Sequence, residues 1–107
     1  MPTSSGTWED LPHHGTLWRL QIYAPGAENL NFGFTTYRLP PGATLHILSI
    51  SDNSYEGPYT AHDNKAHGQL WTPVVSGDRA VIELYLPQGA AEPQLELTHI
   101  GVGYRNL

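Results

Sequence analysis

The segment HGQLWTPVVSGDRAVIELYL, residues 67–86, alternates apolar and polar side chains on both sides of a glycine-containing turn. One face carries Leu70, Thr72 and Val74 in the first arm and Ile82, Leu84 and Leu86 in the second. This period-two alternation around residues 76–80 predicts a β-hairpin. If both apolar sets face the core, Val74 pairs with Ile82. The same register places Trp71 opposite Tyr85 on the other face.

Two adjacent aromatic rings among polar neighbours are typical of a surface that binds sugars. The rings stack on the apolar face of a sugar, and the neighbouring polar groups bond its hydroxyls. The predicted carbohydrate-binding residues are Trp71, Tyr85, Gln69, His67, Tyr55 and Tyr59. A second interpretation stays open, in which another sheet or loop covers both rings, because large aromatic side chains are mostly buried.

The composition of the chain predicts an all-β fold. The 107 residues suffice for one domain, and they include 11 glycines and nine prolines between short β-branched and aromatic runs. No long stretch has helical periodicity. We therefore expect a two-layer antiparallel β-sandwich with little or no helix, whose small core leaves no room for a deep enzyme cleft.

The strands of this sandwich are expected at residues 16–24, 29–37, 44–50 and 94–100, in addition to the hairpin. In the second strand, Leu30, Phe32 and Phe34 are predicted to face inward, while Gly33 marks a bend or a close contact with a neighbour. The third strand, in which four of seven residues are apolar, should lie centrally, with His46 packed and hydrogen-bonded rather than acting as a ligand.

Two segments are expected to lack regular structure. Residues 1–15 are predicted to form a flexible tail or linker held by Trp8, ahead of a single module at residues 16–107. Residues 51–68 are predicted to form one long irregular loop.

Charge and hydropathy exclude two classes of partner. The formal net charge is -5, and the five Lys and Arg residues do not cluster, so we expect no nucleic-acid partner. No apolar run approaches the roughly 20 residues of a membrane-spanning helix, so we expect no membrane partner. The chain begins without the basic and hydrophobic parts of a signal peptide, and Met1 is expected to head a module cut from a longer, secreted protein.

No catalytic constellation is recognisable in the sequence. The serines lie in the tail, at a strand end or in turns, and none belongs to a Gly-x-Ser-x-Gly elbow. Glu83 and Glu96 could in principle form a carboxylate pair for glycoside cleavage, but they are expected on strand faces that offer no cleft. The sequence therefore predicts a protein that is not an enzyme.

The metal-ligating residues favour calcium over zinc. There is no cysteine, and the six histidines lack the spacing of a zinc motif. Residues 51–68 concentrate carboxylate and amide oxygens, with Asp52 and Asp63 as the main candidates for a structural calcium ion. The alternative is that these residues are solvated or form Asx turns.

Several segments resemble the non-catalytic region that precedes the trypsin-like domain in secreted bacterial lysyl-endopeptidase-type proteases. They are residues 15–19, 29–34, 38–43, 57–60, 63–73 and 103–105. The most specific is DNKAHGQLWTP, residues 63–73, and the resemblance extends over about residues 15–107. It implies a jelly-roll or CUB-like β-sandwich appended to an exported enzyme, with the catalytic triad in the domain that follows.

Together these observations predict a non-catalytic module that binds β-linked polysaccharide of the β-glucan type and targets an appended, secreted hydrolase. The alternative is a folding or substrate-docking module of a secreted serine protease, with aromatic side chains packed internally or against the neighbouring domain. The two hypotheses differ in what Trp71 contacts.

Overall fold

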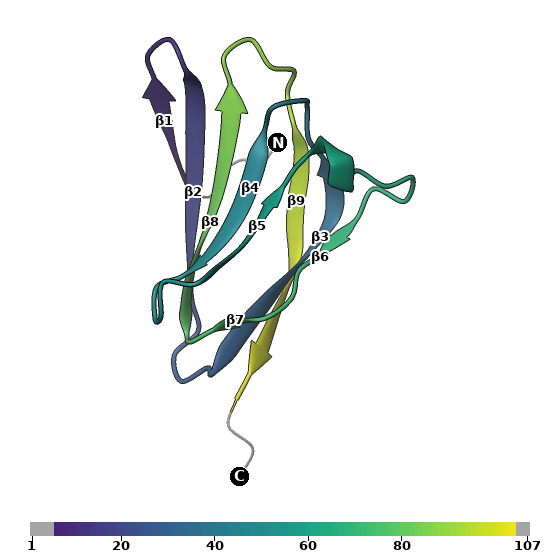
Figure 1. The fold of residues 1–107 in the computed structure, drawn as a ribbon. Helices are drawn as coiled ribbons and strands as arrows, with labels where there is room; N and C mark the ends of the chain where they lie inside the picture. Colours follow the sequence, from purple (N-terminus) through teal and green to yellow (C-terminus); the bar gives the residue numbers. More distant parts are fainter. Residues whose placement is uncertain (1–5, 105–107) are drawn as a thin grey trace.

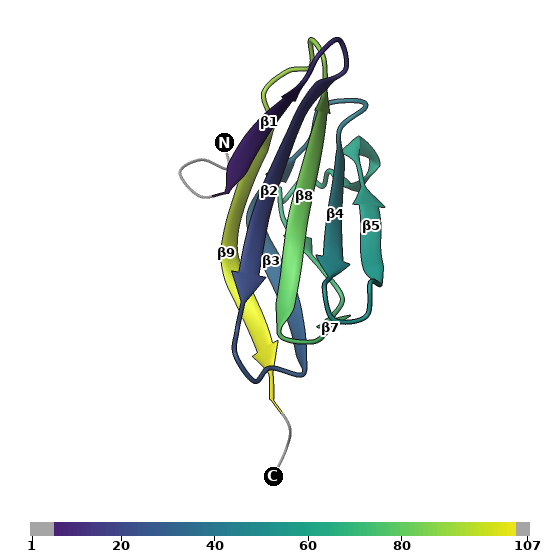
Figure 2. The same ribbon diagram turned by 90° about the vertical axis from the view of Figure 1, so that its left-hand side faces the viewer.

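The computed structural model describes residues 6–104, which form two antiparallel β-sheets packed face to face (Figure 1). Sheet A has the strand order β1-β2-β8-β4-β5, which Figure 2 shows side by side. Sheet B is built around β3, which pairs with β6 and β7 along one edge and with β9 along the other. The strands are β1 (Thr7–Leu11), β2 (Gly15–Tyr23), β3 (Asn29–Arg38), β4 (Thr44–Ser49), β5 (Tyr55–Tyr59), β6 (Leu70–Trp71), β7 (Val75–Ser76), β8 (Arg79–Pro87) and β9 (Gln94–Gly103). The predicted all-β sandwich is confirmed.

The core lies between the two sheets and is filled by alternating side chains of both. Sheet A contributes Trp18, Leu45, Ile47, Ile82 and Leu84, and sheet B contributes Leu30, Phe32, Phe34, Tyr37 and Leu95. The predicted inward orientation of the second strand is therefore confirmed. The shortest dimension of the molecule is 24 Å. Since two packed sheets stand about 10 Å apart, this thickness holds two layers and leaves the outer face of each sheet at the surface.

The predicted hairpin at residues 67–86 is wrong. The first arm is split into β6 and β7, and both pair with β3 in sheet B. The second arm, β8, pairs with β2 and β4 in sheet A. The predicted partners accordingly separate: Val74 is 56% exposed, whereas Ile82 is fully buried and pairs with Ile47.

The two arms separate because the chain passes from sheet B to sheet A between β7 and β8. After β7, the turn leaves sheet B, and the amide of Gly77 donates to the carbonyl of Glu28 at 2.7 Å. The chain then enters β8, both of whose edges are occupied by the long strands β2 and β4. Alternation correctly identifies which side chains of β8 face inward, but it carries no information about which strand lies beside them.

Two predicted irregular segments contain strands. Thr7–Leu11, within the expected tail, forms β1 at the edge of sheet A, and the Trp8 ring lies 6.4 Å from the Trp18 ring. Its side chains are mostly exposed, which explains why its composition resembles a tail. Tyr55–Tyr59, within the expected loop, forms β5 and pairs with β4. Residues 1–5 of the predicted tail and residues 105–107 of the predicted module lie outside the described residues.

Helical structure is limited to one short turn in the part of the chain that the structure describes. It is the 3₁₀ segment η1 (Ala61–Asp63), whose capping box joins Thr60 and Asp63. Between residues 6 and 104, no helix is long and apolar enough to span a membrane.

Candidate functional site

Trp71 lies on the outer face of sheet B and is 51% exposed. Its backbone pairs with Gly33 in the middle of β3, and a Cβ atom at Gly33 would overlap the six-membered part of the indole ring. The ring therefore lies against the backbone of the central strand. This confirms the prediction that Gly33 marks a close contact with a neighbour, and it explains why glycine is present at a position where it weakens a strand.

Hydrogen bonds and a second ring hold the indole in place. Its Nε1 donates to Oε1 of the Gln69 side chain at 3.2 Å, and the backbone N–H of Gln69 donates to Nδ1 of His67 at 3.0 Å. On the far side of Gly33, the His99 ring of β9 lies 5.1 Å from the Trp71 ring at an angle of 58°. The two outer strands are roughly 10 Å apart, so their rings meet across the space that Gly33 leaves empty.

Farther along the same outer face, asparagines of β3 pair with glycines of β9. Asn31 pairs with Gly101, and Asn29 pairs with Gly103. A Cβ at either glycine would overlap the amide of its asparagine. The side-chain amide of each asparagine therefore lies flat against the backbone of its partner glycine on β9. We call this surface the Trp71 shelf, defined as Trp71, His99, Gly33, Asn31, Gly101, Asn29, Gly103 and Ser76, which is the β7 partner of Asn29.

Three of the six predicted carbohydrate-binding residues are brought together: Trp71, Gln69 and His67. Tyr85 is not, because it belongs to β8 in sheet A, where it pairs with Leu17 and Thr44. Its hydroxyl donates to the carbonyl of His14 at 2.6 Å and so fastens the β1–β2 turn. The prediction that Tyr85 lies opposite Trp71 is wrong, since the two residues belong to different layers.

Tyr55 and Tyr59 also lie on sheet A, at opposite ends of β5. Tyr55 is 60% exposed and its ring lies 5.7 Å from that of His46, in an edge-on arrangement. His46 is half-buried and packs against this ring, and the hydrogen bond expected for it stays a prediction. Tyr59 is half-buried, and burial, followed by the charges of Glu56 and Asp63, raises the pKa of its hydroxyl. Neither tyrosine belongs to the Trp71 shelf.

The predicted calcium ligands Asp52 and Asp63 are separated by the length of β5. Asp52 precedes this strand, and its Oδ1 accepts hydrogen bonds from the amide of Ser54 at 2.9 Å and from its hydroxyl at 2.6 Å. These two bonds lower the pKa of Asp52 to about 2. Asp63 follows β5 and accepts from the amide of Thr60 at 2.8 Å as part of the η1 capping box. The bond from the Ser54 amide to the Asp52 side chain is that of an Asx turn, which was the alternative to a calcium site.

The other titratable groups are dispersed as well. Glu83 in sheet A is bound by Arg19 at 2.8 Å, and Glu96 lies on β9 in sheet B, so the two carboxylates do not form a pair. Within residues 6–104, no three His, Asp or Glu side chains gather in a group that suits a metal ion.

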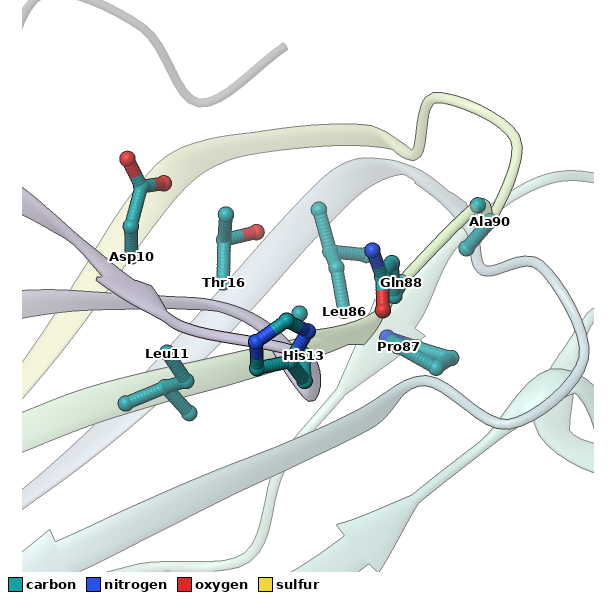
Figure 3. Close-up of a pocket in the computed structure, with 10 residues that line it drawn as sticks. Asp10, Leu11, His13, Thr16, Leu86, Pro87, Gln88 and Ala90 are labelled. Atoms are coloured by element: carbon teal, nitrogen blue, oxygen red, sulfur yellow. The ribbon is translucent and has the colours of Figure 1, made fainter.

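An open cavity of about 410 Å³ lies at one end of sheet A, between the β1–β2 turn and the residues that follow β8 (Figure 3). Its polar lining comes from Asp10, His13, Thr16 and Gln88, which Figure 3 shows as separate side chains around the opening. It contains none of the predicted site residues and lies on a different sheet from Trp71.

The polar residues of the shelf that sequence reasoning missed are His99, Asn31, Asn29 and Ser76, together with the glycines Gly101 and Gly103. In the strand predicted at residues 29–37, both asparagines alternate with the inward-facing Leu30 and Phe32. Alternation therefore already predicts that the asparagine side chains face outward. It does not predict their position beside Trp71, because that position depends on the pairing of β3 with β6 and β9.

Comparison with known proteins identifies one family. The family model described as the lysyl endopeptidase N-terminal domain matches residues 3–100, which include β1 to β8 and most of β9. No solved structure matches the chain. The family match confirms the resemblance drawn from residues 15–107.

Proposed function

We propose that this chain, which belongs to the family of lysyl endopeptidase N-terminal domains, is a non-catalytic accessory domain of an exported bacterial serine protease. The observation that carries this proposal is the family match over residues 3–100, which covers nearly the whole sandwich. The domain assists the catalytic domain attached to it, in folding or in docking on a substrate.

Three of the ten acidic side chains are engaged in local structure, which supports a non-catalytic role. Glu83 is bound by Arg19, Asp63 caps η1, and Asp52 holds a turn. A general base needs a carboxylate or imidazole aimed at a bound substrate, whereas these three carboxylates are engaged in local structure.

The test compares three forms of a lysyl-endopeptidase-type catalytic domain: alone, fused behind this chain, and fused behind an unrelated β-sandwich of similar size. Each form is unfolded in urea and refolded, and the yield of active enzyme is measured. kcat/KM is then measured on a small lysyl amide and on an insoluble protein. We expect this chain alone to raise the refolding yield or to improve kcat/KM selectively on the insoluble protein. Equal behaviour of both fusions in both measurements would refute the proposal.

A second candidate function is supported by Trp71. An indole that is half-exposed on an open sheet face, with its edge bonded to Gln69, has the properties of a platform for the apolar face of a sugar ring. On this proposal the domain binds β-linked polysaccharide and holds the attached enzyme near it.

Affinity electrophoresis of the chain in gels that contain barley β-glucan, xyloglucan, mannan or xylan tests the second candidate. We expect at least one polymer to retard the wild-type protein and Trp71→Ala to migrate as in a gel without polymer. Tyr23→Ala is the matched control, because Tyr23 is equally exposed, at 53%, on sheet A. Unchanged mobility of the wild type in every gel would remove this candidate.

A further inference from the structure

We propose that the polysaccharide site extends from the indole along the whole Trp71 shelf, with Asn31 and Asn29 as residues that bond the hydroxyls of successive sugar units. This inference rests on the second candidate function.

The shelf is long, and it is low beyond its two rings. From Gly33 to Asn29 the strand advances four residues, or roughly 14 Å. Along this distance the partner positions on β9 after His99 are Gly101 and Gly103, and the asparagine amides lie low across them. Beyond the rings of Trp71 and His99, no β9 side chain projects from this surface. An extended polysaccharide chain can therefore lie along it, starting at the indole.

The charge of the shelf selects the chemistry of its ligand. Its three cross-strand rows are Trp71–Gly33–His99, Asn31–Gly101 and Ser76–Asn29–Gly103, and they contain no Asp, Glu, Lys or Arg. An amide offers one acceptor and two donors without a charge, which suits a hydroxyl that both donates and accepts. A neutral polyhydroxylated chain matches this combination of ring and amides, whereas an acidic or basic polymer would find no partner charge.

The two parts of the track have different roles. Stacking on the indole supplies contact area, because a rigid ring with two torsions loses little entropy when it is covered. The amides determine which face and direction of the chain fit. Removing one amide is therefore expected to weaken binding by about three- to tenfold, whereas removing the indole abolishes it.

The glycines permit a steric test that leaves the indole untouched. Gly101 has no positive φ, and the atom that a new Cβ would meet first is the end of the flexible Asn31 side chain. Gly101→Val is therefore expected to preserve the backbone of β9 and to place a branched side chain in the path of the ligand. We expect Gly101→Val to lose retardation in the polymer gel and Asn31→Ala to bind three- to tenfold more weakly. Gln94→Ala, an exposed control outside the shelf on the same strand, is expected to bind like the wild type.

The outcomes separate this inference from the proposal on which it rests. Folding of each variant is verified by its melting temperature and circular dichroism. If Trp71→Ala abolishes binding while Gly101→Val and Asn31→Ala bind like the wild type, the indole platform stands and the track is wrong. If no polymer retards the wild type, both are wrong. If Gly101→Val unfolds, Gly103→Ser and Asn29→Ala carry the same test, and wild-type affinity in both overturns the track.

Discussion

At the scale of single residues, Trp18 and Trp71 have opposite roles. Trp18 is 3% exposed within the core, whereas Trp71 is 51% exposed on sheet B. Both belong to strands with alternating patterns, so alternation alone does not distinguish them. The distinction comes from the layer on each side: sheet B covers Trp18, and solvent covers the outer face of Trp71.

This difference predicts unequal losses of stability. Trp18→Ala removes a buried aromatic side chain and should lower the free energy of unfolding by about 3–5 kcal/mol. Trp71→Ala removes a ring of which half is already in water, and it should lower that free energy by about 1–2 kcal/mol. Urea unfolding monitored by circular dichroism measures both. A loss at Trp71 as large as at Trp18 would assign Trp71 a structural role and weaken the platform hypothesis.

Asp52 is a residue whose local bonds predict a pH response. The hydroxyl and the amide of Ser54 stabilise the charged carboxylate and lower its pKa to about 2, from an ordinary value near 3.8. Because the folded-state pKa is the lower one, the stabilising contribution is fully present above the unfolded-state pKa and is lost as the pH falls through about 2.

The corresponding experiment is an NMR titration of the Asp52 carboxyl in the wild type and in Ser54→Ala. We expect a midpoint near 2 for the wild type. Ser54→Ala removes the hydroxyl donor and leaves the amide donor, so the midpoint should move up toward the ordinary aspartate value. The same midpoint in both proteins would show that the Ser54 hydroxyl does not bond Asp52.

At the scale of elements, the junction between β6 and β7 is held by one buried side chain. Pro73 has no amide hydrogen, and the two short strands on either side of it contribute only two residues each. Thr72 bridges the gap: its amide donates to the carbonyl of Phe32 at 2.9 Å, and its hydroxyl accepts from the amide of Phe32 at 3.0 Å. This pair of bonds keeps β6, and therefore Trp71, aligned with β3.

Replacing Thr72 tests that role. Thr72→Val has nearly the same shape but leaves the buried amide of Phe32 without an acceptor, so we expect a loss of about 1–3 kcal/mol in the free energy of unfolding. Thr72→Ser keeps the hydroxyl and should lose less. Chemical denaturation of the three proteins provides the comparison. If valine is tolerated better than serine, packing of the Thr72 methyl group, and not the hydrogen bond, secures the junction.

At the scale of the whole molecule, the sandwich separates the groups that the sequence appeared to bring together. Tyr85, Tyr55 and Tyr59 lie on sheet A, and Trp71 lies on sheet B. Asp52 and Asp63 lie beyond opposite ends of β5, each bonded to nearby residues.

This separation predicts the response to calcium. Binding of the ion at Asp52 and Asp63 would require both carboxylates to leave their present partners and to approach each other. We therefore expect the same melting temperature in millimolar calcium and in excess chelator. A rise with calcium that the chelator reverses would contradict the arrangement and restore the calcium hypothesis.

The fold class, the inward-facing side chains of β3 and β8, and the family follow from the amino-acid sequence alone. Period-two alternation records which side of a strand meets the core, and segments such as residues 63–73 carry the family resemblance. The neighbours of Trp71 follow from the strand pairing in three dimensions. Strand pairing joins residues far apart in the chain, such as Gly33 with both Trp71 and His99. Alternation does not predict such pairing, because it indicates only which face of the sheet a side chain occupies and not which strand lies next to it.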